Sequence, residues 1–409
     1  MTMPKRSLLT DLIKNHNPLS NENNRPEKWG LVLSGGGTKG AYEIGAWRAI
    51  RELRIPIRGI AGTSIGALNA ALFLGCDLKK IENIYRNIQL SDVIPVSSKI
   101  DPNKNVFDRA NLLAITKEYL AQRGLTNAPL RGMLEKHLNV DRVYESPLDL
   151  GIVTFDVSRR EPLQIFKEDI EKDKLIDYLL ASANFPIFKT QNLNGKRFVD
   201  GGLYDNVPFN LLIERGYTHL IVIDINGIGM TRKVEHADKI YLKVVTCSEA
   251  LGGTFEFNKE RISRNMTLGY LDTLKAFHKL FGSYYFFRRP AFNDLLLNFD
   301  LDTIWGLETA ARLYNIDRLC IYKAEDFLYA LGTRHLEMEQ KYAQTVKSGR
   351  FSGELLEFRK AVSSGFGIPA LVSYFTEQPV SRNGAFSKAY PDLSDAAKAI
   401  IALKNHQKR

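Results

Sequence analysis

Cysteine is scarce in this chain of 409 residues, which has only Cys76, Cys247 and Cys320. The three positions are scattered, and none of them forms the short spacings used by zinc sites or disulfide frameworks. We therefore expect neither a structural metal nor a disulfide scaffold, and a reducing interior is the simplest setting. No cofactor is predicted from the sequence.

Long apolar runs are also lacking, and no stretch approaches the roughly 18 uninterrupted apolar residues that a membrane span requires. The first residues do not read as a secretory signal, because Leu8 and Leu9 are followed at once by Thr10 and Asp11. We expect a cytoplasmic protein, with peripheral attachment to a membrane as an option. Export by a route that leaves no N-terminal signal stays open.

The formal net charge is +10, from 56 basic and 46 acidic side chains. A basic surface favours anionic membranes and nucleic acids alike, so the charge does not decide between these partners. The chain contains no zinc-finger spacing, no RNP-type aromatic motif and no recognition helix, and we expect no nucleic-acid partner. It also shows no internal repeat and no sustained heptad pattern. Its oligomeric state is not predicted.

The length suits one large domain or two modest ones. Residues 1–28 are polar and rich in asparagine, and we expect a loose leader there. Residues 29–250 alternate apolar runs with helical patterns, which predicts an α/β fold with a mostly parallel central sheet flanked by helices. Residues 251–409 predict a largely helical C-terminal region.

The predicted strands are 30–34, 57–61, 148–155, 163–166, 220–225 and 240–245. The predicted helices of the first region are 41–53, 67–74, 78–88, 109–122 and 175–183. Those of the C-terminal region are 260–280, 303–314, 324–345, 353–363 and 394–405. These assignments rest on apolar spacing and on the glycines that end several of the patterns.

The most informative segment is Gly62 to Gly66, which reads G-T-S-I-G between an apolar strand and a good helix former. In that setting Ser64 would sit on a nucleophile elbow, a tight turn that exposes the hydroxyl at the carboxyl edge of the sheet. The flanking glycines let neighbouring backbone pass close by, and the helix N-terminus adds positive dipole. The same pattern on its own also occurs as an ordinary turn.

A glycine-rich loop follows the first predicted strand. The N–H groups of Gly35, Gly36 and Gly37 can converge on one small space, as an oxyanion requires. The loop also fits the dinucleotide-binding pattern, but the second strand does not end on the acidic residue that would hold a ribose. It fails as a phosphate loop because Lys39 is followed by Gly40. A purely structural glycine turn remains an alternative.

Asp200 ends a short apolar run and precedes Gly201 and Gly202. An aspartate in this position can lie within hydrogen-bond reach of a serine on a neighbouring strand. None of the seven histidines follows a strand in a glycine-flanked loop, where the base of a triad is usually found. His335 is expected on a solvated helix face and His219 at a strand edge. An α/β-hydrolase triad therefore lacks its third member.

The three motifs, in this order, resemble those of the patatin-like phospholipase family. They are the glycine-rich loop, the G-x-S-x-G elbow and the D-G-G aspartate, and the resemblance covers residues 29–225. It implies a catalytic dyad of Ser64 and Asp200. Its oxyanion-hole and supporting residues would be Gly35, Gly36, Gly37, Lys39, Gly40, Gly62, Gly66, Gly201 and Gly202. Most members carry arginine where this chain has Lys39, and lysine lacks the planar fork.

A further segment, residues 181–188, is similar to the run that lines the approach to the site in this family. Phe185 and Phe188 would then form a wall for an acyl chain, although ordinary core packing explains both equally well.

The resemblance implies a lipid acyl hydrolase of the phospholipase A type, which cleaves carboxylic esters of phospholipids through an acyl-enzyme and without a metal. The substrate would be a phospholipid or another lipid ester at a membrane surface. One alternative is a non-catalytic lipid- or protein-binding module on the same fold, against which the three intact motifs argue. Another is a thioesterase or peptidase with the same dyad, which the sequence does not exclude. Headgroup, acyl position and chain length are not predicted.

Residues 283–290 combine four aromatic side chains with two arginines. Such a mixture suits a membrane interface, where rings lie at headgroup depth and cations meet anionic lipid. A buried strand followed by a basic turn explains the same residues.

Overall fold

The computed structural model describes residues 28–95, 125–193, 195–345, 355–377 and 388–407. Two compact units make up the chain, Met1–Ala276 and Phe277–Arg409. The predicted leader, Lys28 apart, and the predicted helix at 109–122 lie outside the described residues.

The first unit contains an eight-stranded sheet, counted over the described residues, with the order β5-β6-β3-β2-β1-β7-β8 and β4 beside β3. The strands are β1 (Trp29–Leu33), β2 (Ile57–Thr63), β3 (Asp149–Asp156), β4 (Glu161–Phe166), β5 (Gln191–Leu193), β6 (Lys196–Asp200), β7 (His219–Asp224) and β8 (Tyr241–Thr246). Strands β3, β2, β1, β7 and β8 pair in parallel. Strands β4 and β6 pair antiparallel to β3, and β5 pairs antiparallel to β6. The predicted α/β fold with a mostly parallel sheet is confirmed.

Helices cover this sheet. They are α2 (Ala41–Glu52), α3 (Ile65–Gly75), α4 (Leu78–Asn87), α6 (Ala128–His137), α7 (Val140–Glu145), α8 (Leu175–Ser182), α9 (Phe209–Glu214) and α10 (Lys259–Ala276). Short 3-10 turns are η1 (Gly37–Gly40), η2 (Leu90–Asp92), η3 (Lys167–Asp169), η4 (Lys172–Lys174), η5 (Gly201–Leu203) and η6 (Ala237–Lys239). The near-continuous apolar strands β1 and β7 are almost fully buried, as expected for a sheet covered on both faces.

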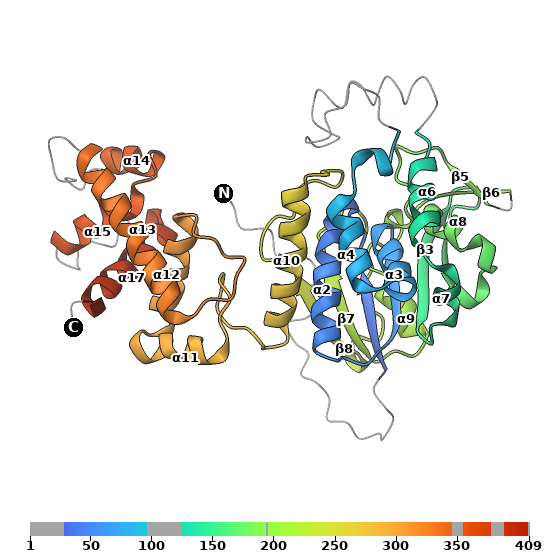
Figure 1. The fold of residues 1–409 in the computed structure, drawn as a ribbon, viewed down its shortest axis with the longest axis horizontal. Helices are drawn as coiled ribbons and strands as arrows, with labels where there is room; N and C mark the ends of the chain where they lie inside the picture. Colours follow the sequence, from blue (N-terminus) through green and yellow to red (C-terminus); the bar gives the residue numbers. More distant parts are fainter. Residues whose placement is uncertain (1–27, 96–124, 194, 346–354, 378–387, 408–409) are drawn as a thin grey trace. The chain divides into compact units, whose positions relative to one another are not determined.

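Helices α2 and α10 lie side by side (Figure 1). Their backbones approach closely at Gly45 and Gly269, where a Cβ would collide with the carbonyl groups of Met266 and Tyr42. The first unit therefore extends to Ala276 and includes a helix that follows residue 251, where the sequence places the start of the C-terminal region. The division into 1–28, 29–250 and 251–409 remains a proposal about domain organisation.

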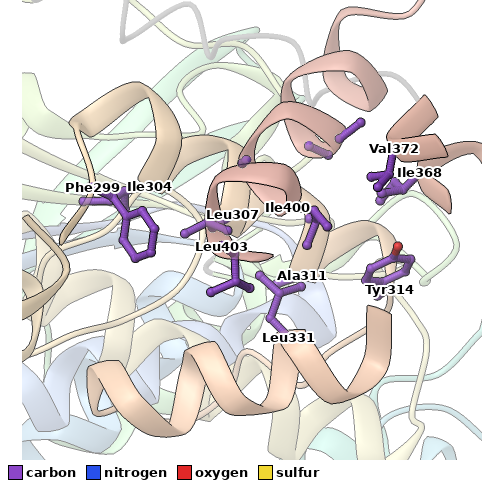
Figure 2. Packing of buried hydrophobic residues seen from close by; sticks show 14 of the residues in the cluster. Phe299, Ile304, Leu307, Ala311, Tyr314, Leu331, Ile368, Val372, Ile400 and Leu403 are labelled. Carbon is purple, nitrogen blue, oxygen red and sulfur yellow. The ribbon is translucent and has the colours of Figure 1, made fainter. Parts of the chain in front are cut away.

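The second unit is helical, as predicted for the C-terminal region. Its helices are α11 (Arg289–Asn298), α12 (Leu301–Leu313), α13 (Ala324–Thr345), α14 (Leu355–Ser363), α15 (Gly367–Glu377) and α17 (Pro391–Gln407). Side chains from several of them interdigitate in one core (Figure 2), which includes Leu307, Leu331, Ile400 and Leu403. Helices α11 and α15 were not predicted from the sequence.

Of the two interpretations of residues 283–290, the membrane interface is wrong. Tyr285, Phe286 and Phe287 are fully buried, as the alternative requires, although these residues form no strand. The expected solvated position of His335 is also wrong. His335 is only 4% exposed, and its Nδ1 lies 2.7 Å from the hydroxyl of Tyr314, because α13 turns this side toward the core. The spacing of polar residues in α13 does not reveal that packing. No described helix combines the length and apolar character needed to cross a membrane.

Candidate active site

Ser64 and Asp200 meet along one edge of β3. Thr63 pairs with Val153 of β3, and Asp200 pairs with the next residue, Thr154. Strand β4 occupies the opposite edge of β3 over residues 151–156, so β2 and β6 share the remaining edge. The two strands meet there end to end. This register joins side chains 136 positions apart, and the Ser64 Oγ donates a hydrogen bond of 2.7 Å to the Asp200 Oδ2.

The backbone at Ser64 is strained, with φ 56° and ψ −125°. Such a conformation costs a non-glycine residue about 1–3 kcal/mol and persists only when its surroundings hold it. The Ser64 N–H donates to the Ser182 Oγ at 3.0 Å, and the Ser182 hydroxyl donates to the carbonyl of Val153 at 2.6 Å. Ser182 thus links the elbow to β3. In the sequence, the only signal for this role of Ser182 is its place in segment 181–188.

The positions around the elbow need glycine because neighbouring backbone lies too close to leave room for a Cβ atom. A Cβ at Gly62 would collide with the backbone of Gly66, and one at Gly66 would collide with the carbonyl of Leu33 in β1. At the end of β6, a Cβ at Gly201 would collide with the carbonyl of Val153. These predicted motif residues let the chain ends of β2 and β6 pack against neighbouring strands.

The carboxyl group of Asp200 is buried, with 6% of the residue exposed. Its Oδ1 accepts the N–H of Gly202 at 2.8 Å, while its Oδ2 accepts the Ser64 hydroxyl. Burial raises the pKa of Asp200 to about 6, against the effect of these two hydrogen bonds. A carboxylate with a pKa near neutrality is better matched to proton transfer from a hydroxyl than an ordinary aspartate is.

The three predicted oxyanion donors are placed differently. The N–H of Gly35 donates to the carbonyl of Asn206 at 3.1 Å, so it is engaged and does not point to an oxyanion. Gly36 and Gly37 line the same cavity as Ser64. Over the described part of the chain, these two N–H groups donate to no backbone carbonyl in the turns and loops. Gly37 has φ 61°, where a side chain would be strained and would collide with Thr254.

Lys39 braces the glycine loop, because its Nζ donates to the carbonyl of Asn226 at 2.9 Å. Burial lowers the pKa of Lys39, against the attraction of Cys247 and Asp224. The interaction is with a single carbonyl, for which the point charge of a lysine suffices.

A buried polar network supports the other end of the loop. The amide of Asn69 donates to the carbonyl of Gly40 at 3.1 Å and to the carboxyl of Glu43 at 2.7 Å. The hydroxyl of Tyr85 donates to the same Asn69 side chain at 2.5 Å. Burial raises the pKa of Glu43 well above its usual range, against the effect of its hydrogen bond from Asn69. None of these three side chains belongs to a motif that the sequence reveals.

An apolar cavity of about 240 Å³ opens beside the dyad. Phe185 and Phe188, from the segment expected to form an acyl wall, both line it, and Phe185 packs edge-on against Phe255 at 5.5 Å. Other apolar lining residues are Leu68, Leu72, Ile84, Met133 and Phe257. Among the described residues, no histidine lines the cavity, and no cluster of three or more His, Cys, Asp or Glu side chains is arranged to hold a metal ion.

Comparisons with known proteins agree with the motifs. Residues 31–213 match the family model described as patatin-like phospholipase. Lysophospholipase NTE1 of Cryptococcus neoformans is 25% identical over 212 residues, which cover 52% of this chain and 12% of that protein. Neuropathy target esterase sws of Drosophila melanogaster is 25% identical over 229 residues, which cover 52% of this chain and 14% of that protein. The match thus spans a small part of each relative.

Among solved structures, VipD from Legionella pneumophila aligns over 100% of this chain and 93% of its own, with a TM-score of 0.40 and 14% identity.

Proposed function

From the premise that residues 31–213 form a patatin-like phospholipase domain, we propose that this chain is a lipid acyl hydrolase of the phospholipase A type. The observation that carries the proposal is the 2.7 Å hydrogen bond between Ser64 and Asp200 beside an apolar cavity. A nucleophile bonded directly to its base is the arrangement that acyl transfer requires.

In the proposed reaction, Asp200 accepts the proton of the Ser64 hydroxyl as the Oγ attacks the ester carbonyl. The N–H groups of Gly36 and Gly37 stabilise the oxyanion, and losing one such donor typically costs about 3 kcal/mol of barrier. Asp200 then gives its proton to the departing alcohol, which leaves an acyl group on Ser64. Water enters and attacks the acyl carbonyl while Asp200 removes its proton. Asp200 then passes this proton to the departing Ser64 Oγ, which releases the fatty acid and restores the serine hydroxyl.

The substrate class follows from the lining of the cavity. Its apolar side chains suit an acyl chain, and the ester carbonyl would lie at the polar end with Ser64. We propose a phospholipid or a related lipid ester, reached by a cytoplasmic protein at a membrane surface. The proposed reaction uses no metal or other cofactor, and no nucleic acid takes part.

The test compares wild type with Ser64→Ala on a short-chain ester and on phospholipid vesicles, with released acid as the measurement. We expect Ser64→Ala to lose at least about 10³-fold in kcat/KM while it unfolds like wild type. Ser158→Ala, which changes an exposed serine, is the matched control and should keep full activity.

Three outcomes would contradict the proposal in different ways. Equal rates for wild type and Ser64→Ala would show that Ser64 is not the nucleophile. Lipid binding without any turnover would favour a binding module. A strong preference for a thioester or a peptide over the oxygen ester would reassign the leaving group.

A further inference from the structure

Exposed apolar side chains gather at the mouth of the cavity. Ile228 is 72% exposed, Met230 63% and Leu203 52%. In the described part of the first unit, Val157, at 37%, is the one other large apolar side chain of this kind. Ile228 and Leu203 also line the cavity that holds the dyad. Clustered exposure of this kind marks an interaction surface rather than random surface composition.

The segment that carries two of these residues, 227–235, is anchored to the turn that follows Asp200; we call it the docking loop. The N–H of Met230 donates to the carbonyl of Gly202 at 2.9 Å, and the N–H of Asn206 donates to the carbonyl of Met230 at 2.6 Å. These bonds fix the middle of the loop to the catalytic turn. The apolar side chains are therefore presented to solvent by a held backbone.

The far end of the docking loop is held as well. The amide of Asn210 donates to the carbonyl of Lys233 at 2.8 Å and accepts the N–H of Glu235 at 3.0 Å. A preorganised loop loses little conformational freedom when a partner covers it, which favours binding.

Cations follow the apolar side chains directly. Lys233 is exposed, and the guanidinium of Arg232 lies over the ring of Tyr204 at 5.0 Å and pairs with Glu235 at 3.4 Å. Apolar side chains that can enter the acyl region, with basic side chains beside them at headgroup depth, match the surface of an anionic bilayer. The net charge of +10 acts in the same direction.

We propose that the docking loop seats the first unit on an anionic membrane, with Ile228 and Met230 inserted among the acyl chains and Lys233 at the headgroups. This orientation places the cavity mouth on the bilayer, so that a lipid ester can pass from the membrane to Ser64 without crossing water. The inference rests on the proposed function for its substrate, but membrane docking itself is measured without catalysis.

The experiment uses the full chain in a Ser64→Ala background, so that the vesicles are not consumed and binding is separated from hydrolysis. Sedimentation measures binding to vesicles of phosphatidylcholine with about 30 mol % phosphatidylserine. Met230→Ser should weaken binding about 10-fold, and the double change Ile228→Ser with Met230→Ser about 30-fold or more. Lys233→Gln should weaken it about 5-fold on anionic vesicles only. Val157→Ser is the matched control and should bind like its parent.

A second measurement reports insertion directly. Cysteine replaces Met230 in a Cys320→Ser background, because Cys320 is the exposed native thiol among the three cysteines. An environment-sensitive dye on that cysteine should shift to the blue when anionic vesicles are added, whereas the same dye on Val157→Cys should not.

Three results would overturn the docking proposal. One is equal vesicle binding by Met230→Ser, Val157→Ser and their parent. Another is a dye that is already blue-shifted in buffer, which means that the chain or a second copy covers the loop. The third is a dye emission that does not change when anionic vesicles are added. Loss of vesicle binding by Met230→Ser would support docking even if the chain hydrolysed no ester.

Discussion

Asp200 in the first unit and Glu308 in the second are both buried carboxyl groups, 6% and 1% exposed, but their partners differ. Asp200 accepts the hydroxyl of a serine that faces a cavity. Glu308 accepts three backbone N–H groups, those of Ser283, Tyr284 and Tyr285, at 2.9, 2.5 and 2.7 Å. The comparison teaches that burial alone does not identify a catalytic acid. What matters is whether its partner can exchange a proton with a substrate.

The surroundings of the two groups follow the same division. The first unit has strained backbone at Ser64, which lines the cavity, and a buried acid with a raised pKa at Glu43. In the second unit, Glu308 ties the chain before α11 to helix α12 within a core of apolar and aromatic side chains. Strained backbone and buried acids, such as those in the first unit, are typical of functional sites.

Asp200→Asn tests the first-unit side of the comparison and should have the largest effect. Removal of the base is expected to lower kcat/KM on a short-chain ester by about 10²–10⁴-fold. Asp205→Asn is the matched control, because Asp205 is also buried, with a pKa raised to about 7, but its carboxyl bonds the N–H of Val207. Equal losses for both variants would show that any buried acid in this turn matters, and the comparison would fail.

Glu308→Ala tests the second-unit side. Three N–H groups would lose their acceptor at about 1–3 kcal/mol each, so we expect the free energy of unfolding to fall by at least about 3 kcal/mol. Denaturant unfolding measures the loss, and hydrogen exchange should show weaker protection at residues 283–285. The exposed Glu325→Ala is the control, with an expected change below about 0.5 kcal/mol. A similar small change for Glu308→Ala would contradict a structural role.

Ser182→Ala sharpens the first-unit side, because Ser182 positions Ser64 without touching the substrate. Loss of its hydroxyl should lower kcat by about 10–100-fold and leave KM nearly unchanged. The control is Ser158→Ala, which removes a hydroxyl that accepts the N–H of Arg197 at 3.1 Å on the surface. If both variants had the same kcat, the hydrogen bond between Ser182 and Ser64 would not contribute to the rate.

The pH dependence of the activity has the smallest expected effect. Because Asp200 must be ionised to act as a base and its pKa is about 6, kcat/KM should fall about tenfold per unit below pH 6 and level off above it. The free energy of unfolding changes with pH in the opposite direction to kcat/KM. The folded state keeps this proton between about pH 4 and about pH 6 while the unfolded state releases it, so stability falls as pH rises through that window. Asp200→Asn should remove this contribution, and a slope that survives in the variant would assign it elsewhere.

Local motifs were predictable because each lies within a few neighbouring residues. The strand, the tight turn and the helix around Ser64 follow from Gly62 to Gly66 and the apolar runs beside them. The contact with Asp200 could be expected from the resemblance, but its cause is the shared edge of β3. That register depends on an antiparallel β6, which the apolar pattern does not distinguish from a parallel strand.

Residues whose role depends on distant partners could not be predicted. The N–H of Gly35 is taken by a carbonyl from Asn206, far along the chain, so the glycine pattern alone overcounts oxyanion donors. The hydroxyl of Ser182 comes from the end of α8. The burial of His335 is decided by tertiary packing, which composition does not report.

The most direct test of the account is covalent labelling of the intact protein with an alkyl fluorophosphonate, followed by mass spectrometry of its peptides. The account predicts a single adduct on Ser64, formed much more slowly in Asp200→Asn and absent in Ser64→Ala. An unlabelled Ser64, or a labelling rate that does not change when Asp200 is replaced, would contradict the claim that this serine is activated by this aspartate.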